Sequence, residues 1–415
     1  MKIAINAASA KRGGAVTYLS NLLRHLPSAE SGFQFFVFLP SETAKRLLDI
    51  HASIKICPLP AKKVGGWRRL WWEQVTLRRF LVREKVDALF STANFAMLRC
   101  PAKQILLVRN ALYFSILYQQ LFLAKHGLRT KVAFRLRRQL ICRSVRSADL
   151  VMTPTRAMLE ELRAYVNIPD SRALVNPYGV TLEDNNQRQP AGSAPARDFG
   201  GSAATVRLLY VSLYNEYKNL RTLLKALPLL NHNGVRKWVL TSTVDPAWAE
   251  TSWMLTCKDD LALARQPDVA PWVGFVGPLP RGQTERLYLN TDIFVFPSLT
   301  ESFGFPMPEA MSYGLPVVAS DTPVNREVCG DAAIYFSPLS AEDLAQQLER
   351  VALDHELRAK LVASGRRRVA ANFQWRDHVG RILRAAKAPT HPSDAVENAQ
   401  GECTEGDSMP TVGRI

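Results

Sequence analysis

Residues 297–311 read Pro-Ser-Leu-Thr-Glu-Ser-Phe-Gly-Phe-Pro-Met-Pro-Glu-Ala-Met and are flanked by two short apolar runs, 292–297 and 315–320. Apolar runs of this length, each bounded by turn residues, are typical of strands buried in a parallel sheet. The segment between them contains a glycine, Gly304, and several prolines, which favour a loop that leads into a helix. We therefore predict a strand, a loop, a short helix and a second strand over these residues.

Two carboxylates have defined places in this pattern. Pro308 suits the first turn of a helix, where its missing N–H costs little, and Gly314 can end the same helix. Glu301 is therefore expected in the loop and Glu309 in the first helical turn. A helix start beside a loop glycine suits a diphosphate, and carboxylates accept hydrogen bonds from ribose and sugar hydroxyls. The pattern favours a nucleotide-sugar site, although an acidic residue in a first helical turn is also common for electrostatic reasons alone.

Outside this segment, strand-like and helix-like stretches alternate on both sides of one polar linker. The predicted strands are 3–6, 33–39, 86–91, 104–108, 150–154, 207–212, 237–241, 273–276, 292–297 and 315–320. This alternation predicts an α/β chain with two parallel-sheet domains, which bind ligands at the carboxyl ends of their strands. We divide the chain into an N-terminal domain, a linker, a C-terminal domain, a last helix and a disordered tail: residues 1–185, 186–206, 207–375, 376–388 and 389–415.

The 415-residue chain has a formal net charge of +16, and residues 101–148 contain ten Lys or Arg and no Asp or Glu. A basic face fits nucleic acid, anionic lipid or an acidic substrate. The absence of zinc-finger, helix-turn-helix and ribonucleoprotein motifs disfavours nucleic acid as a partner. The six scattered cysteines are typical of reduced thiols. With no signal peptide and no long apolar run, we expect a cytoplasmic protein or one peripheral on the inner face of the plasma membrane.

The segment from Glu301 to residue 320 resembles the donor-binding signature of glycosyltransferase family 4, in which two glutamates flank seven residues and a Gly-Leu-Pro-Val-Val strand follows. Residues 209–223, 177–180 and 13–14 are similar to further motifs of that family, and the resemblance extends over about residues 2–385. It implies the GT-B fold, in which two Rossmann-like domains face each other across a deep cleft. The N-terminal domain would bind the acceptor and the C-terminal domain the donor, with the helix at 376–388 crossing back to the first domain.

The resemblance also implies roles for single residues. Glu309 would bind the ribose of the nucleotide, Glu301 would contact the donor sugar, and Lys218 would neutralise the diphosphate. The remaining donor-binding positions are Ser302, Gly304 and Phe305, and, from the other domain, Gly13 and Gly14. Gly304 and Phe305 would offer backbone N–H groups to the donor. The alternatives without a functional role are a solvated surface position for Lys218 and an ordinary turn for the glycine pair.

The chain departs from the family pattern at two places. Many members carry an Arg shortly before the phosphate-binding Lys, but residues 212–217 contain none, and Arg281 is a candidate substitute. Many members also carry a His-Asp pair where this chain has Arg109 and Asn110, which we interpret either as acceptor-side residues or as a structural strand end. An Arg stays protonated and cannot act as a general base. In retaining members of the family, the departing phosphate is thought to accept the acceptor proton, so the missing base does not exclude catalysis. No metal or other cofactor is expected, because Lys218 and helix N–H groups would supply the positive charge and the sequence offers no Asp-x-Asp pair suited to a metal-bound nucleotide.

The N-terminal half also contains aromatic residues beside basic ones, at 66–74, 114–118 and 121–122. Such residues suit a membrane interface, and the alternative is that Trp71 and Trp72 lie in the core. The favoured function is a retaining hexosyltransferase (EC 2.4) that moves a sugar, with mannose as a candidate, from a nucleotide-sugar to a glycan or polyprenyl-linked acceptor in polysaccharide or lipopolysaccharide synthesis. Two alternatives are a non-catalytic subunit that binds nucleotide-sugar or glycan, and a GT-B enzyme of other chemistry, such as an epimerase.

Overall fold

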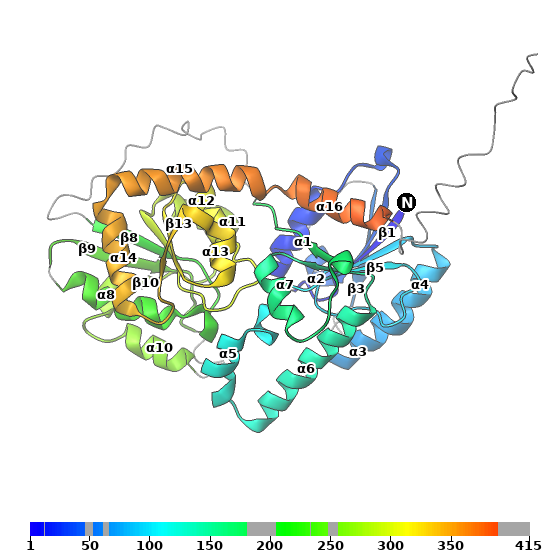
Figure 1. Cartoon of the computed structure of the whole chain (residues 1–415), viewed down its shortest axis with the longest axis horizontal. Helices are drawn as coiled ribbons and strands as arrows, with labels where there is room; N and C mark the ends of the chain where they lie inside the picture. The colour runs from blue at the N-terminus through cyan, green and yellow to red at the C-terminus, as the bar shows by residue number, and fades with distance from the viewer. Residues whose placement is uncertain are drawn as a thin grey trace, which may run out of the picture.

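The computed structural model describes residues 1–11, 13–45, 53–60, 66–180, 205–232, 234–247 and 256–388. These residues form two α/β domains, each built on one parallel sheet that is packed against helices (Figure 1). This architecture confirms the expected α/β class with two Rossmann-like domains. Most of the expected linker 186–206 and all of the expected tail 389–415 lie outside the described residues.

The N-terminal domain contains a seven-stranded parallel sheet in the order β3-β2-β1-β4-β5-β6-β7. Its strands are β1 (Lys2–Asn6), β2 (Gln34–Pro40), β3 (Ile54–Leu59), β4 (Ala88–Ser91), β5 (Lys103–Leu107), β6 (Leu150–Thr153) and β7 (Ala173–Val175). Its helices include α1 (Gly14–Arg24), α2 (Ser41–Ala44), α3 (Gly66–Trp71), the π-helical η3 (Trp72–Leu77), α4 (Arg78–Arg83), α5 (Ile116–Leu121), α6 (Leu128–Ser147) and α7 (Arg156–Arg163). Ile3 of β1 pairs with Phe35 on one side and with Ala88 on the other. The strand order reverses at β1, and such reversal points are where these sheets bind ligands.

The C-terminal domain repeats this plan with a six-stranded parallel sheet in the order β10-β9-β8-β11-β12-β13. Its strands are β8 (Thr205–Tyr210), β9 (Lys237–Ser242), β10 (Val273–Phe275), β11 (Ile293–Phe296), β12 (Val317–Ser320) and β13 (Ala333–Phe336). Its helices include α8 (Leu220–Asn231), α10 (Cys257–Ala264), α11 (Arg281–Leu289), α12 (Pro306–Ser312), α13 (Pro323–Cys329), α14 (Ala341–Leu353) and α15 (His355–Asn372). Every residue of β11 and β12 is buried, as expected for central strands covered on both faces. Here the order reverses between β8 and β11.

The sequence-based boundaries need small corrections. The second sheet begins at Thr205, two residues before the expected start of its domain. The helix that follows β2 is described only over α2, and residues 46–50 lie outside the described residues. Thr155 caps α7, because its hydroxyl accepts a hydrogen bond from the N–H of Met158 at 3.2 Å.

The last two described helices connect the domains. α15 runs along the C-terminal domain, and α16 (Trp375–Lys387) packs against α1 and β5 of the N-terminal domain (Figure 1). The ring of Tyr178 stacks on Phe305 at 4.9 Å and lies 6.5 Å from the ring of Trp375. A Cβ atom on Gly179 would lie 2.3 Å from the backbone nitrogen of Trp375, so only glycine allows this close approach. The chain therefore passes between the domains twice at one aromatic cluster.

The aromatic residues that suggested a membrane interface separate into two groups. Trp72 is buried against Phe38 at 5.6 Å between ring centroids, and Phe114 and Tyr118 are buried as well. Trp71 is instead 63% exposed. The expectation that these aromatics face a membrane is therefore wrong for the buried residues. Among the described helices, none is long and apolar enough to cross a bilayer.

The neighbouring tryptophans allow a direct test of this division. Trp72→Ala removes a buried ring and should lower the free energy of unfolding by about 3–5 kcal/mol. Trp71→Ala should change it by no more than about 0.5 kcal/mol. Chemical denaturation of the two variants measures both values. Equal destabilisation would contradict the assignment of Trp72 to the core and Trp71 to the surface.

Candidate active site

The loop after β8 is fastened to the end of β11, its neighbour at the point where the strand order reverses. Asn219 adopts a left-handed conformation with φ of 56°, which asparagine tolerates better than most residues. Its side-chain amide donates to the carbonyls of Pro297 at 3.1 Å and Pro338 at 2.7 Å. The N–H of Leu299 donates in turn to the carbonyl of Tyr217 at 2.8 Å. These bonds hold the residue between them, Lys218, at the carboxyl end of the sheet.

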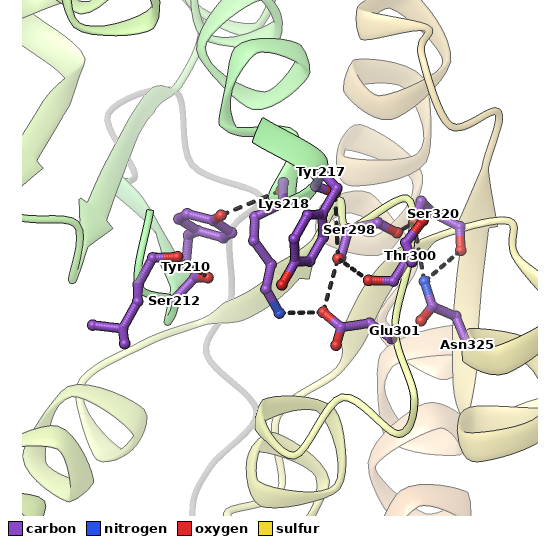
Figure 2. A network of polar contacts seen from close by, with 10 residues as sticks. Tyr210, Ser212, Tyr217, Lys218, Ser298, Thr300, Glu301, Ser320 and Asn325 are labelled. Atoms are coloured by element: carbon purple, nitrogen blue, oxygen red, sulfur yellow. Dashed lines mark hydrogen bonds and ion pairs between the residues drawn. The ribbon is translucent and has the colours of Figure 1, made fainter. Parts of the chain in front are cut away.

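Lys218 and Glu301 form an ion pair at this edge (Figure 2). The hydroxyl of Ser298 donates to the same Glu301 oxygen at 2.8 Å. The Lys218 ammonium also lies 5.5 Å from the centroid of the Tyr217 ring and 5.7 Å from that of Phe296. Burial lowers the pKa of Lys218, but the charge of Glu301 and the proximity of Tyr217 raise it, and the net pKa lies above that of free lysine. Lys218 is therefore a permanent cation in a largely enclosed setting, and not a solvated surface lysine.

The glycine loop that follows Glu301 has little steric freedom. Gly304 has φ of 75°, and a Cβ atom there would lie 2.6 Å from Met307 Cε and 3.1 Å from a Phe296 ring carbon. The N–H of Met307 donates to the carbonyl of Gly304 at 3.0 Å, and the prolines at both ends of this first turn have no N–H. The backbone N–H groups of Gly304 and Phe305 form no hydrogen bond with another described residue. The hydrogen-bond donors available to an anion are therefore backbone N–H groups of the loop rather than of the interior of α12.

Glu309 lies in the first turn of α12, as predicted, and Gly314 follows the helix end with φ of 74°. The hydroxyl of Tyr288 donates to Glu309 Oε2 at 3.1 Å. Burial raises the pKa of Glu309 to about 7, against the opposing effects of the Tyr288 hydrogen bond and the charge of Arg281. Arg281 pairs with Glu285 at 3.3 Å. Because its charge also lowers the pKa of Glu309, Arg281 belongs to the Glu309 end of the site rather than to the surroundings of Lys218.

The two expected glycines lie opposite this edge. Gly13 has φ of 58° and precedes α1, and a Cβ atom there would lie 3.4 Å from Leu213 Cδ1, in the loop after β8. A Cβ atom on Gly14 would have no atom within 4 Å. The loop after β1 therefore touches the loop after β8, with open space at Gly14. The ligand-binding edges of the two sheets face each other, as a ligand held between the domains requires.

In the Arg109–Asn110 pair, Asn110 has a structural role and Arg109 is a cation available to a ligand. Asn94, which sequence reasoning missed, accepts from the backbone N–H groups of Arg109 at 2.9 Å and Asn110 at 3.2 Å. The side-chain oxygen of Asn110 accepts from the N–H of Leu112 at 3.2 Å and caps a 3₁₀ turn. The guanidinium of Arg109 lies 5.6 Å from the centroid of the Tyr18 ring. Asn110 is thus a capping residue, and Arg109 is the side chain of the pair that remains for a ligand.

Sequence reasoning also missed the polar contacts that join the two edges. The hydroxyls of Ser115 and Thr300 lie 2.8 Å apart, and Thr155 donates to the carbonyl of Ser302 at 3.0 Å. Glu327 of α13 accepts from two backbone N–H groups at the start of α7, each at 2.7 Å. These residues pair across long sequence separations, so no local spacing could have indicated them.

A further buried contact lies beside Lys218, in the loop after β8. Glu216 Oε1 accepts from the hydroxyl of Tyr118 at 2.9 Å and lies 3.3 Å from His126 Nε2, and both partners belong to the N-terminal domain. Because Glu216 is two residues before Lys218, this contact ties the position of the lysine to that of the opposite domain.

Two family models match most of the chain. A family model described as Glycosyltransferase Family 4 matches residues 12–184, and one described as Glycosyl transferases group 1 matches residues 203–368. The chain belongs to glycosyltransferase family 4. This family 4 chain is 27% identical over 246 residues to O-antigen chain mannosyltransferase B of Escherichia coli, a match that covers 59% of this chain and 62% of that relative. The match thus spans less than two thirds of the relative's length.

Two solved structures show that the fold is shared far more widely than the sequence. A sucrose-phosphate synthase from Thermosynechococcus elongatus superposes with a TM-score of 0.72 at 17% identity, covering 96% of this chain and all of that one. Anabaena HepE in complex with UDP-glucose superposes with a TM-score of 0.63 at 16% identity, covering 93% of this chain and all of that one. These likenesses confirm the GT-B fold of the family 4 chain.

If Glu309 binds the ribose, as the sequence resemblance implies, its pKa predicts how nucleotide-sugar affinity depends on pH. Ribose hydroxyls can donate to both oxygens of a carboxylate, whereas a protonated Glu309 has lost acceptor capacity. Binding should therefore weaken as the pH falls through 7, by up to about tenfold per pH unit. Titration calorimetry from pH 8 to pH 6 measures the slope, with a nucleotide-sugar whose diphosphate diester does not titrate in this range. Glu309→Gln should bind weakly at every pH, and an unchanged slope in that variant would assign the dependence to another group.

Proposed function

We propose that the chain is a retaining hexosyltransferase that moves a sugar from a nucleotide-sugar to a glycan or polyprenyl-linked acceptor in polysaccharide or lipopolysaccharide synthesis. The observation that carries this proposal is the Lys218–Glu301 pair at the carboxyl ends of β8 and β11, facing the loop of Gly13 and Gly14. Family membership supports the class of reaction. The named relative, a mannosyltransferase of O-antigen chains, supports mannose as the candidate sugar and a cell-surface glycan as the product.

The pair suits a donor with two chemically different parts. In the proposed complex, Lys218 turns to the diphosphate, and Glu301 accepts hydrogen bonds from hydroxyls of the sugar ring. The N–H groups of Gly304 and Phe305, together with Gly13 and Gly14 from the other domain, complete the contacts to the donor. Glu309 accepts from the ribose hydroxyls. Each group either stabilises the negative charge that develops on the leaving diphosphate or holds the donor in place.

The proposed reaction requires no protein base. The acceptor oxygen attacks the anomeric carbon on the face from which the diphosphate leaves, and the bond from that carbon to the phosphate oxygen breaks. The acceptor proton passes to the departing phosphate oxygen, so the products are the glycoside and a nucleoside diphosphate. Arg109 remains protonated and cannot take that proton. It can bind an anionic group of the acceptor, and Lys218 with backbone N–H groups replaces a metal at the diphosphate.

The proposed setting is the cytoplasmic face of the membrane, where a lipid-linked acceptor would be presented. Incubation of the purified chain with a panel of nucleotide-sugars and lipid-linked or glycan acceptors, with and without EDTA, tests the proposal. We expect transfer with one donor in the presence of EDTA and an anomeric configuration equal to that of the donor by NMR. Nucleotide-sugar binding without turnover under all conditions would favour the non-catalytic alternative.

Substitution of the two glutamates should separate binding from chemistry. Glu301→Ala should lower kcat by about 10²-fold or more while largely retaining nucleotide affinity, because Lys218 and the loop N–H groups remain. Glu309→Ala should weaken nucleotide binding by about 1–3 kcal/mol, because hydrogen bonds to a charged group are lost. Calorimetry with the nucleoside diphosphate and steady-state kinetics measure the two effects. Glu349→Ala, at an exposed position on α14, is the matched control and should change neither. If both site variants behave like this control, the site is wrongly placed.

A further inference from the structure

One helix of the N-terminal domain exposes an unusual number of large apolar side chains. Along α6, Leu128 is 74% exposed, Val132 44%, Leu136 60% and Leu140 38%. Residues four apart are neighbours on a helix surface, so these four side chains form one continuous stripe. The opposite side of α6 supplies the buried residues Phe134, Ile141, Cys142 and Val145. The stripe is therefore a second apolar face, and it is most exposed at Leu128 and Leu136.

Basic side chains surround this stripe. The helix carries seven Lys or Arg and no Asp or Glu, and five of the seven are exposed: Arg129, Arg135, Arg137, Arg143 and Arg146. None of these five forms an ion pair with an acidic residue in the described part of the chain. An exposed apolar stripe bordered by unpaired cations is the pattern of a helix that lies in a membrane interface.

The basic surface continues beyond the C-terminal end of α6. A depression of about 560 Å³ is lined by Arg78, Arg99, Arg143 and Arg146, together with Gln74, Leu98 and Ser147. A second depression of about 470 Å³ shares Gln74 and Arg78 with the first and adds Arg79, Arg83, Val75 and Val82. No acidic residue lines either one, and within the described part of the chain the only ion pair formed by the arginines of these depressions is that of Arg83 with Glu84 at 3.0 Å.

We propose that α6 and the two arginine-lined depressions form one docking surface for an anionic phospholipid bilayer. The stripe of Leu128, Val132, Leu136 and Leu140 enters the boundary between headgroups and acyl chains, and the arginines bind lipid phosphates. Guanidinium groups pair with phosphate in a two-pronged geometry, and desolvation at the interface strengthens that contact. A nucleic acid would satisfy the arginines but not the four aliphatic side chains, which favours lipid as the partner.

The position of this surface adds a membrane contact to the proposed function. The inference rests on that function only for the identity of the acceptor. α6 lies on the outer side of the N-terminal domain, with α5 between its first turns and the C-terminal domain (Figure 1). The cap of α5, Ser115, contacts Thr300 in the loop of the donor glutamate. A bilayer against α6 would therefore stand beside the edge where the two domains meet. The partly exposed Trp71 belongs to α3, which Figure 1 shows next to the other end of α6.

Vesicle flotation of the full chain tests the surface without any transfer reaction. The unmodified chain should float with phosphatidylcholine vesicles that contain phosphatidylglycerol, and not with phosphatidylcholine alone, at low salt. Leu136→Ser should weaken partitioning about tenfold or more, since a buried leucine is lost from the interface. Leu353→Ser removes the same side chain at nearly equal exposure, 61% against 60%, from α14 of the other domain and should bind normally.

The arginines are tested in the same assay with charge-matched controls. Arg143→Gln with Arg146→Gln should weaken partitioning onto anionic vesicles about 25-fold, or about fivefold for each charge near the surface. Arg265→Gln with Arg350→Gln, both exposed positions in the C-terminal domain, should have little effect. Thermal unfolding confirms that each variant is folded.

Three outcomes would overturn the proposal: no flotation with anionic vesicles, equal flotation of the α6 variants and their controls, or binding to RNA or heparin alone with no effect of Leu136→Ser. Transfer to a soluble acceptor fragment should survive all α6 substitutions, so failure of the surface and failure of the proposed reaction are told apart.

Discussion

The stacking of Tyr178 on Phe305 links the position of the N-terminal domain to the loop that follows Glu301 in the C-terminal domain. Tyr178 belongs to the segment that leaves the N-terminal sheet, and Phe305 belongs to the loop that carries the donor N–H groups. Both rings lie within 6.5 Å of Trp375, where the chain returns to the first domain. The same aromatic cluster therefore joins the domains and positions the donor loop. A change in the angle between the sheets would alter this stack, so the geometry of the site and the closure of the domains are coupled.

The Lys218–Glu301 pair balances two opposite charges in a largely enclosed part of the fold. A cation and a carboxylate in a largely enclosed position cost free energy unless each has a partner, and loss of one partner costs about 3–5 kcal/mol. Here each neutralises the other, and Ser298 adds a hydrogen bond to the carboxylate. A donor that carries both negative phosphates and hydroxyls can replace these contacts one for one. Under the proposed function, such an exchange of partners would make the free energy of binding depend on both ends of the donor, and would favour an intact nucleotide-sugar over either fragment.

Much of this arrangement could be predicted from the sequence, for physical reasons. Central strands such as β11 are continuous apolar runs, and the caps and helix ends at Thr155 and Gly314 follow local rules. The partners of the site residues could not be predicted, because Tyr288 reaches Glu309 and Lys218 reaches Glu301 only through the tertiary fold. The two adjacent tryptophans show the same limit at the surface. A difference of one position along a helix turns a side chain by 100°, and neither composition nor charge indicates which one faces the core.

The substitution of Arg109 and Asn110 for the usual histidine and aspartate is consistent with a reaction that depends on positioning. Asn94 holds the backbone of both residues, and Asn110 caps the following turn, so the strand end keeps its shape without the usual pair. What changes is the charge: a group that can exchange protons near neutral pH is replaced by one that cannot. If catalysis required a proton acceptor on the protein here, the chain would have lost its activity while keeping every donor contact. If the departing phosphate takes the proton, the same substitution adds a fixed cation beside the acceptor and leaves the chemistry intact. Under the proposed function the second case is the consistent one, because the Lys218–Glu301 pair at the sheet edge can stabilise the departing diphosphate without a base on the protein.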